Sequence, residues 1–74
     1  MGKLRRMSGQ DVRTILEEHG FEVVRQRGSH MVMQKRSEEG TITVPVPDHD
    51  EMKIGTLRSI IRQSEVPKAE FETE

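Results

Sequence analysis

The hydrophobic positions of the first twenty residues follow the period of a helix. Ser8 and Asp11 have the spacing of a capping box, and Gly20 stands where a glycine commonly ends a helix. Residues 8–19 are therefore predicted to form a short amphipathic helix. Its apolar face is expected to consist of Val12, Ile15 and Leu16.

The middle of the chain changes to the alternating period of β-strands. Residues 21–27 and 30–36 are rich in valine, and the Gly28-Ser29 pair between them suits a two-residue type II′ turn. After a second turn at residues 37–40, residues 41–46 alternate strictly, which predicts a third antiparallel strand. The prolines at 45 and 47 mark the end of that strand or an edge position.

Helical spacing returns in the last third of the chain and stops before Pro67, which cannot continue a helix. We therefore expect an α+β fold in the order α-β-β-β-α, with a three-stranded antiparallel sheet and two helices on one face. Residues 1–66 are predicted to form a single domain, and the Glu-rich residues 67–74 an acidic, flexible tail. The apolar positions of the last helix are Ile54, Leu57, Ile60 and Ile61.

The two tight turns fix an expected register for the strands. A two-residue turn at Gly28-Ser29 pairs Arg27 with His30 and Val24 with Met33. Val24 and the two strand methionines then lie under the helices, and the arginines share the open face with His30. Three apolar residues also fall on that open face, a patch that suggests a protein partner. These residues are Phe21, Val23 and Val32.

Composition narrows the class of protein. The chain has 74 residues, of which 31 % are hydrophobic and 34 % charged, so its core is small. A net charge of −1 argues against a protein that coats nucleic acid by bulk charge. The basic residues Arg25, Arg27, Lys35 and Arg36 nevertheless occur in a stretch without carboxylates, which predicts a local basic patch.

The chain contains no cysteine, which excludes a disulfide framework, a thiolate metal site and a catalytic thiol. It also lacks a long apolar run and the apolar stretch of a signal peptide. We therefore expect a cytoplasmic protein without a membrane segment.

His30 is the strongest candidate for chemistry, because an imidazole exchanges a proton near neutral pH and this one follows a tight turn among cations. Arg25 and Arg27 could hold a phosphate beside it. The alternative is an exposed histidine at the end of a hairpin. Antiparallel pairing brings His49 near His30 at Pro47, so His49 is either a second acid or base or a solvated loop residue.

Two further motifs allow a structural or a functional interpretation. The oxygen-rich run of residues 48–51 could bind a divalent metal, or it could cap the following helix. Gly55 and Thr56, in the first turn of that helix, could present backbone amides to a phosphate or form a plain turn. We assign no metal and no other cofactor.

These motifs together resemble the HicA (YcfA-like) toxin family over residues 8–63. The resemblance rests on Gly20-Phe21, Arg25, Gly28-Ser29-His30, Val44-Pro45, His49 and residues 55–63, in this order. It implies a double-stranded-RNA-binding-like fold and a ribosome-independent endoribonuclease of a type II toxin–antitoxin system. It also implies that His30 is catalytic and that a HicB-like antitoxin neutralises the protein.

The expected function is therefore metal-independent cleavage of mRNA, with His30 as general acid or base and His49 or water for the second proton transfer. Arg25 and Arg27 would stabilise the phosphorane. A rival class is a non-catalytic RNA-binding module or a degenerate toxin that only binds its antitoxin, and a purely structural role would show no RNA affinity. Predicted RNA contacts are Arg25, Arg27, Gly28, Ser29, Lys35, Arg36, Gly55 and Thr56, and predicted antitoxin contacts are Phe21, Val23, His30 and Val32.

Overall fold

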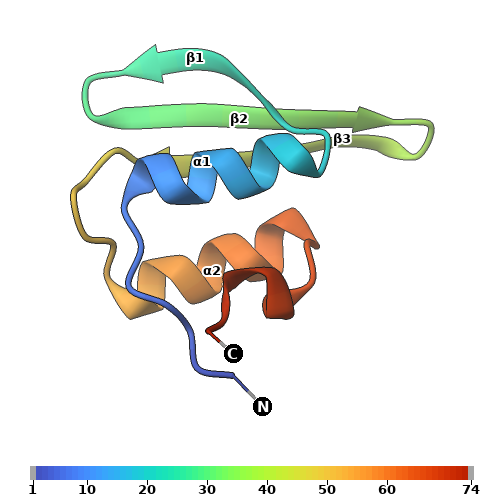
Figure 1. The fold of residues 1–74 in the computed structure, drawn as a ribbon. Coiled ribbons are helices and arrows are strands. Elements are labelled where there is room, and N and C mark those ends of the chain that lie inside the picture. The colour runs from blue at the N-terminus through green and yellow to red at the C-terminus, as the bar shows by residue number, and fades with distance from the viewer. Residues whose placement is uncertain (1, 74) are drawn as a thin grey trace.

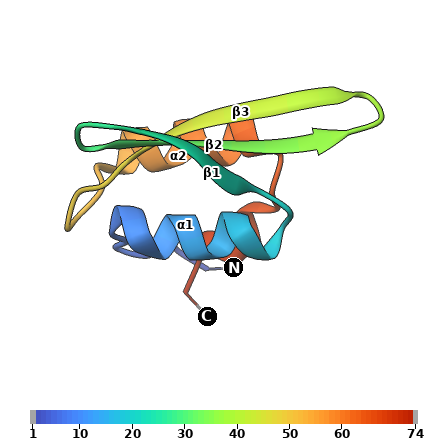
Figure 2. The same cartoon turned by 90° about the horizontal axis from the view of Figure 1, so that it is seen from above.

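A computed structural model describes residues 2–73 and confirms the predicted α-β-β-β-α order. The strands form one antiparallel sheet in the order β1-β2-β3, and both helices lie on the same face of it (Figures 1 and 2). No helix among residues 2–73 has the length and apolar content that crossing a bilayer requires. The elements are α1 (Gly9–Glu18), β1 (Glu22–Arg27), β2 (His30–Ser37), β3 (Gly40–Pro47), α2 (Ile54–Ser64) and a short 3-10 helix η1 (Lys68–Phe71).

Helix α1 begins with the predicted capping box. The Ser8 hydroxyl accepts a hydrogen bond from the Asp11 amide at 3.0 Å, and the Asp11 carboxylate accepts one from the Ser8 amide at 3.0 Å. Gly20 follows the helix with a φ of 92°, in the left-handed region where a glycine ends a helix. The start and the end of α1 are thus fixed by the residues that the sequence identified.

The capping box makes the free energy of unfolding depend on pH in the acidic range. Hydrogen bonding from the Ser8 backbone amide, with a smaller contribution from its side chain, lowers the pKa of Asp11 below its ordinary value of 3.8. A carboxyl with a depressed folded pKa stabilises the fold above its unfolded pKa and loses that contribution as the pH falls through the folded pKa. Urea unfolding should therefore show the wild type more stable than Asp11→Asn at neutral pH, with the difference shrinking below about pH 4. A difference that stays constant down to about pH 2 would show that it does not come from the ionised Asp11 carboxylate.

The register between β2 and β3 is the predicted one, whereas β1 contains a bulge. Arg27 pairs with His30 as expected, but Met33 pairs with Val23 instead of Val24, because the register shifts between Val23 and Arg25. One extra residue in a strand reverses which face the preceding side chains occupy. The predicted inward position of Val24 is therefore wrong, and its side chain is 45 % exposed.

The bulge also moves two of the predicted antitoxin contacts. Phe21 is 3 % exposed and Val23 packs against the core, so the placement of both on the open face is wrong. Turning these two side chains inward removes more apolar surface from water than turning Val24 inward would. Val32 does lie on the open face, opposite Arg25.

The C-terminal segment forms part of the domain. Phe71 has no exposed surface and belongs to the core. The amide of Arg5 donates to the Phe71 carbonyl at 2.9 Å, and the amide of Thr73 donates to the Lys3 carbonyl at 2.8 Å. The predicted flexible tail is therefore wrong for residues 67–73, because burial of one aromatic ring outweighs the acidic composition around it; Glu74 lies outside the described residues.

Candidate functional site

His30 lies on the open face of the sheet, at the corner where β2 begins. It directly follows the Gly28-Ser29 turn, in which Gly28 has the positive φ, 54°, that a type II′ turn requires at its first central residue. The imidazole is exposed, and its partner across the strands on one side is Arg27. On the other side its partner is Pro47. This corner leaves the ring accessible to a large ligand.

The second histidine is next to the first. The ring centroids of His30 and His49 are 6.4 Å apart, with an angle of 69° between the ring planes. The predicted proximity of the two residues is therefore confirmed, and the chemical role of each stays a prediction. Two imidazoles at this separation could flank one phosphate and act on different oxygens of it.

Backbone hydrogen bonds hold the loop that carries His49. The amide of Asp48 donates to the carbonyl of Ser29 at 2.6 Å, which ties the loop to the turn before His30. The amide of Gly9 donates to the carbonyl of His49 at 2.9 Å. The side-chain amide of Gln10 adds a hydrogen bond to the Asp48 carboxylate at 3.1 Å. The first residues of α1 therefore hold the loop that carries His49, and this loop in turn is bonded to the turn before His30. The sequence pattern did not reveal this role of α1.

Gly9 is where α1 comes closest to this loop. A Cβ at Gly9 would overlap the Pro47 carbonyl oxygen and lie 2.8 Å from the Asp48 Cα atom, and both of these are backbone atoms. The two segments could make room only by moving apart. Glycine at this position is thus required for the close packing behind the histidines.

Replacing Gly9 with alanine should destabilise the domain by about 1–3 kcal/mol, because the overlap outweighs the gain in helix propensity. Gly55 is the matched control: it also lies in the first turn of a helix, but nothing is within 4 Å of its Cβ position. Gly55→Ala should stabilise the protein by up to about 1 kcal/mol. Thermal or urea unfolding of both variants checks the contrast, and equal shifts of the same sign would contradict it.

A groove of about 430 Å³ runs from His30 along the edge of the sheet to α2. Gly55 and Thr56 line it, so the structure brings the predicted phosphate-binding turn beside the histidine. The prediction did not include Ser59 and Gln63, which line the same groove. They follow Thr56 at helical spacing, so a polar stripe beside the apolar face of the last helix was a usable signal.

The two β1 arginines lie on the same face as His30. Arg25 and Arg27 border a hollow of about 470 Å³ that Val24 and Val32 also line. Within residues 2–73, neither guanidinium is within ion-pair distance of a carboxylate. Arg36 lies further along β2, an even number of residues from His30, and therefore on the same face of the sheet. The open face is therefore locally basic although the chain is not.

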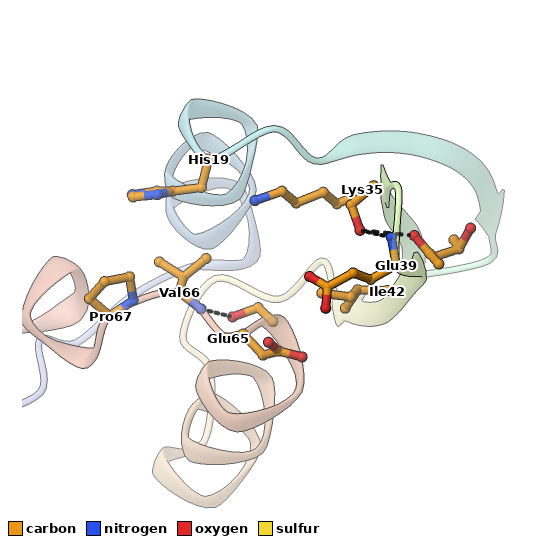
Figure 3. Close-up of a pocket in the computed structure, with 11 residues that line it drawn as sticks. His19, Lys35, Glu39, Ile42, Glu65, Val66 and Pro67 are labelled. Carbon is orange, nitrogen blue, oxygen red and sulfur yellow. Dashed lines mark hydrogen bonds between the residues drawn. The ribbon is translucent and has the colours of Figure 1, made fainter.

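Lys35 belongs to the opposite face. It is adjacent to Arg36 along β2 and so faces the opposite side of the sheet. Its Cε atom is 3.3 Å from the point where a Cβ at Gly20 would lie, on the helix side of the sheet. Figure 3 shows it pointing into a separate cavity of about 500 Å³, lined also by His19, Glu39 and Glu65. Five residues of strand, roughly 17 Å, separate it from His30. The prediction that Lys35 joins the other cations in one patch is therefore wrong.

The acidic loop before α2 does not cap that helix, contrary to one of its two predicted roles. No group of three potential metal ligands occurs in the part of the chain from Gly2 to Thr73. The residue before α2 is Lys53, and no side chain caps the helix. Asp48 instead bonds Gln10, and Glu51 lies 3.5 Å from the Arg6 guanidinium in an exposed ion pair.

The sequence matches a protein-family model over most of its length. That model, described as the HicA toxin of bacterial toxin-antitoxin, matches residues 9–66. The matched region contains α1, the whole sheet and α2, and therefore both histidines and the groove. No protein of curated function matches the chain.

Proposed function

The chain belongs to the HicA toxin family of bacterial toxin–antitoxin systems, and on this premise we propose that it is an endoribonuclease that cleaves mRNA with His30 as general acid or base. The observation that carries the proposal is the pair of imidazoles, 6.4 Å apart between ring centroids, of which His30 also lines a groove. Proton transfer by positioned imidazoles is the usual means of activating a hydroxyl near neutral pH.

The proposed step is attack by a ribose 2′-hydroxyl on the adjacent phosphorus. A new bond forms from the 2′ oxygen to phosphorus, and the bond from phosphorus to the 5′ oxygen breaks. One group takes the 2′ proton and another gives a proton to the leaving 5′ oxygen. His30 performs one of these transfers, and His49 or water performs the other. The products are a 2′,3′-cyclic phosphate and a 5′-hydroxyl end.

Arg25 and Arg27 are proposed to stabilise the charge that develops on the phosphorane. Both are exposed on the face of His30, and Arg27 is its direct cross-strand partner. A guanidinium can donate two parallel hydrogen bonds to phosphate oxygens. Arg36, further along β2, is proposed to contact the RNA backbone without reading its sequence.

A HicB-like antitoxin is the proposed protein partner. Val24 and Val32 form an apolar area among the arginines of the open face, and half-exposed valines in such a setting favour protein contact. An antitoxin that covers this area would also cover His30 and exclude RNA. Val24 takes the place in this surface that the sequence had given to Phe21 and Val23.

The test is RNA cleavage by the purified chain in low salt with EDTA, because transfers through imidazoles require no bound metal ion. Cleavage should stop when a single 2′-deoxynucleotide replaces the ribonucleotide at the cut, since the nucleophile is then missing. The new ends should carry a 2′,3′-cyclic phosphate and a 5′-hydroxyl. Cleavage of the deoxy-substituted strand, or 5′-phosphate ends, would reject this mechanism, and binding without cleavage would favour a non-catalytic RNA-binding module.

A further inference from the structure

We propose that the groove between β3 and α2 binds one unpaired nucleobase next to the scissile phosphate, with Ser59 and Gln63 as its specificity-determining residues. The proposal rests on the nuclease function and adds a substrate class to it: single-stranded RNA, read at one base. The groove begins at His30 itself, so a phosphate held by the imidazole places its own nucleoside there.

One wall of the groove is apolar. Pro45 and Pro47 line it from β3, and Pro47 is the cross-strand partner of His30. A proline ring offers a compact apolar surface, and its residue has no backbone amide hydrogen that would be left unpaired beneath a base. A volume of about 430 Å³ is in the range of clefts that enclose small ligands. This wall suits the face of a nucleobase.

The other wall carries hydrogen-bonding groups. The Ser59 hydroxyl oxygen accepts from the Arg62 guanidinium at 3.4 Å and from the Gln63 side-chain amide at 3.3 Å. With both lone pairs engaged, the Ser59 hydroxyl hydrogen is directed away from these partners and is available as a donor. The Gln63 side-chain oxygen then faces away from Ser59 as an acceptor, and Thr56 adds a hydroxyl. A donor and an acceptor side by side match the edge of a nucleobase.

This arrangement requires an unpaired base. In a duplex, the faces of a base are stacked and its pairing edge is occupied, whereas the groove would contact one face and one edge together. Sequence-specific recognition of RNA depends on bases that are free in this way. We therefore expect cleavage in single-stranded regions, with a preference at the nucleotide beside the cut.

The experiment compares cleavage profiles and binding for Ser59→Ala and Gln63→Leu. Sequencing the ends produced from a randomised single-stranded RNA gives the base preference beside the cut, and both variants should flatten it. Loss of one hydrogen bond predicts a roughly three- to tenfold lower rate on the preferred base, with a smaller change on the others. Ser37→Ala, in the turn at the far end of the sheet, is the matched control and should keep the wild-type profile.

Binding is measured separately from cleavage. Hexamers of A, C or U with 2′-O-methyl groups lack the nucleophile, and NMR should detect amide shifts at Thr56, Ser59 and Gln63 when the preferred hexamer is added. Gln63→Leu should weaken that binding. Unchanged cleavage profiles in both variants would overturn the base site while leaving the nuclease intact. If the wild type cleaves nothing, the hexamer shifts still decide: shifts in the groove support the base site, and their absence rejects it.

Discussion

Replacing His30 with alanine is expected to lower the rate of RNA cleavage by roughly 10²–10⁴-fold, which is the usual loss when a general acid or base is removed. Folding should be unaffected, because the side chain is exposed and takes no part in the core. RNA affinity should also change little, since the arginines of the open face remain. Single-turnover cleavage and fluorescence anisotropy on the same RNA separate the two effects.

His19→Ala is the matched control for this variant. His19 lies at the far end of α1, 3.3 Å from the Glu70 carboxylate, and lines the cavity on the helix side of the sheet. Its removal should leave cleavage at the wild-type rate. His49→Ala then distinguishes the source of the second proton: a loss comparable to that of His30→Ala assigns it to His49, and a small loss assigns it to water. A His30→Ala protein that still cleaves at the wild-type rate would exclude His30 from the chemistry.

Replacing Phe71 with alanine is expected to unfold most of the protein. The ring has no exposed surface, and deleting a buried aromatic side chain costs roughly 3–5 kcal/mol. A domain of this size has roughly 3–5 kcal/mol of stability in total. Circular dichroism and amide NMR spectra of Phe71→Ala should therefore show loss of tertiary structure at room temperature.

Lys68→Ala is the control for the same segment. Lys68 forms an ion pair with Glu72 at 3.8 Å, and its side chain is 64 % exposed, so solvent screens the interaction. Its loss should change stability by at most about 1 kcal/mol. A Phe71→Ala protein that melts within a few degrees of the wild type would contradict the view that the C-terminal segment completes the core.

Local signals in the sequence were sufficient for most of the fold. The capping box of Ser8 and Asp11 defined α1, and the short turns fixed the register of β2 against β3. The same register placed His49 near His30, so the centre of the site followed from strand pairing. Lys35 is separated from Met31 and Met33 by even numbers of residues, so the strand period already indicated the helix face for it. The basic stretch was nevertheless interpreted as one patch.

Other features depend on tertiary packing. A bulge at Val24 leaves no separate mark in the Val23-Val24 pair, and it appears only when the burial of Phe21 and Val23 is compared with that of Val24. The acidic composition near Phe71 favoured a solvated tail, yet one aromatic ring was enough to bring the segment into the core. The contact of Gly9 with Pro47 joins parts of the chain that no local pattern connects.

The pairing of Leu4 with Glu72 has a consequence for synthesis of the protein on the ribosome. Leu4 and Glu72 form a β-bridge, so the contact at Leu4 cannot form until residue 72 has been translated. Because Phe71 completes the core, we expect the nascent chain to remain without a stable fold until translation has passed this residue and the segment has left the exit tunnel. The proposed nuclease activity would then begin only after this residue has emerged from the tunnel, and the proposed antitoxin would meet the chain as it folds.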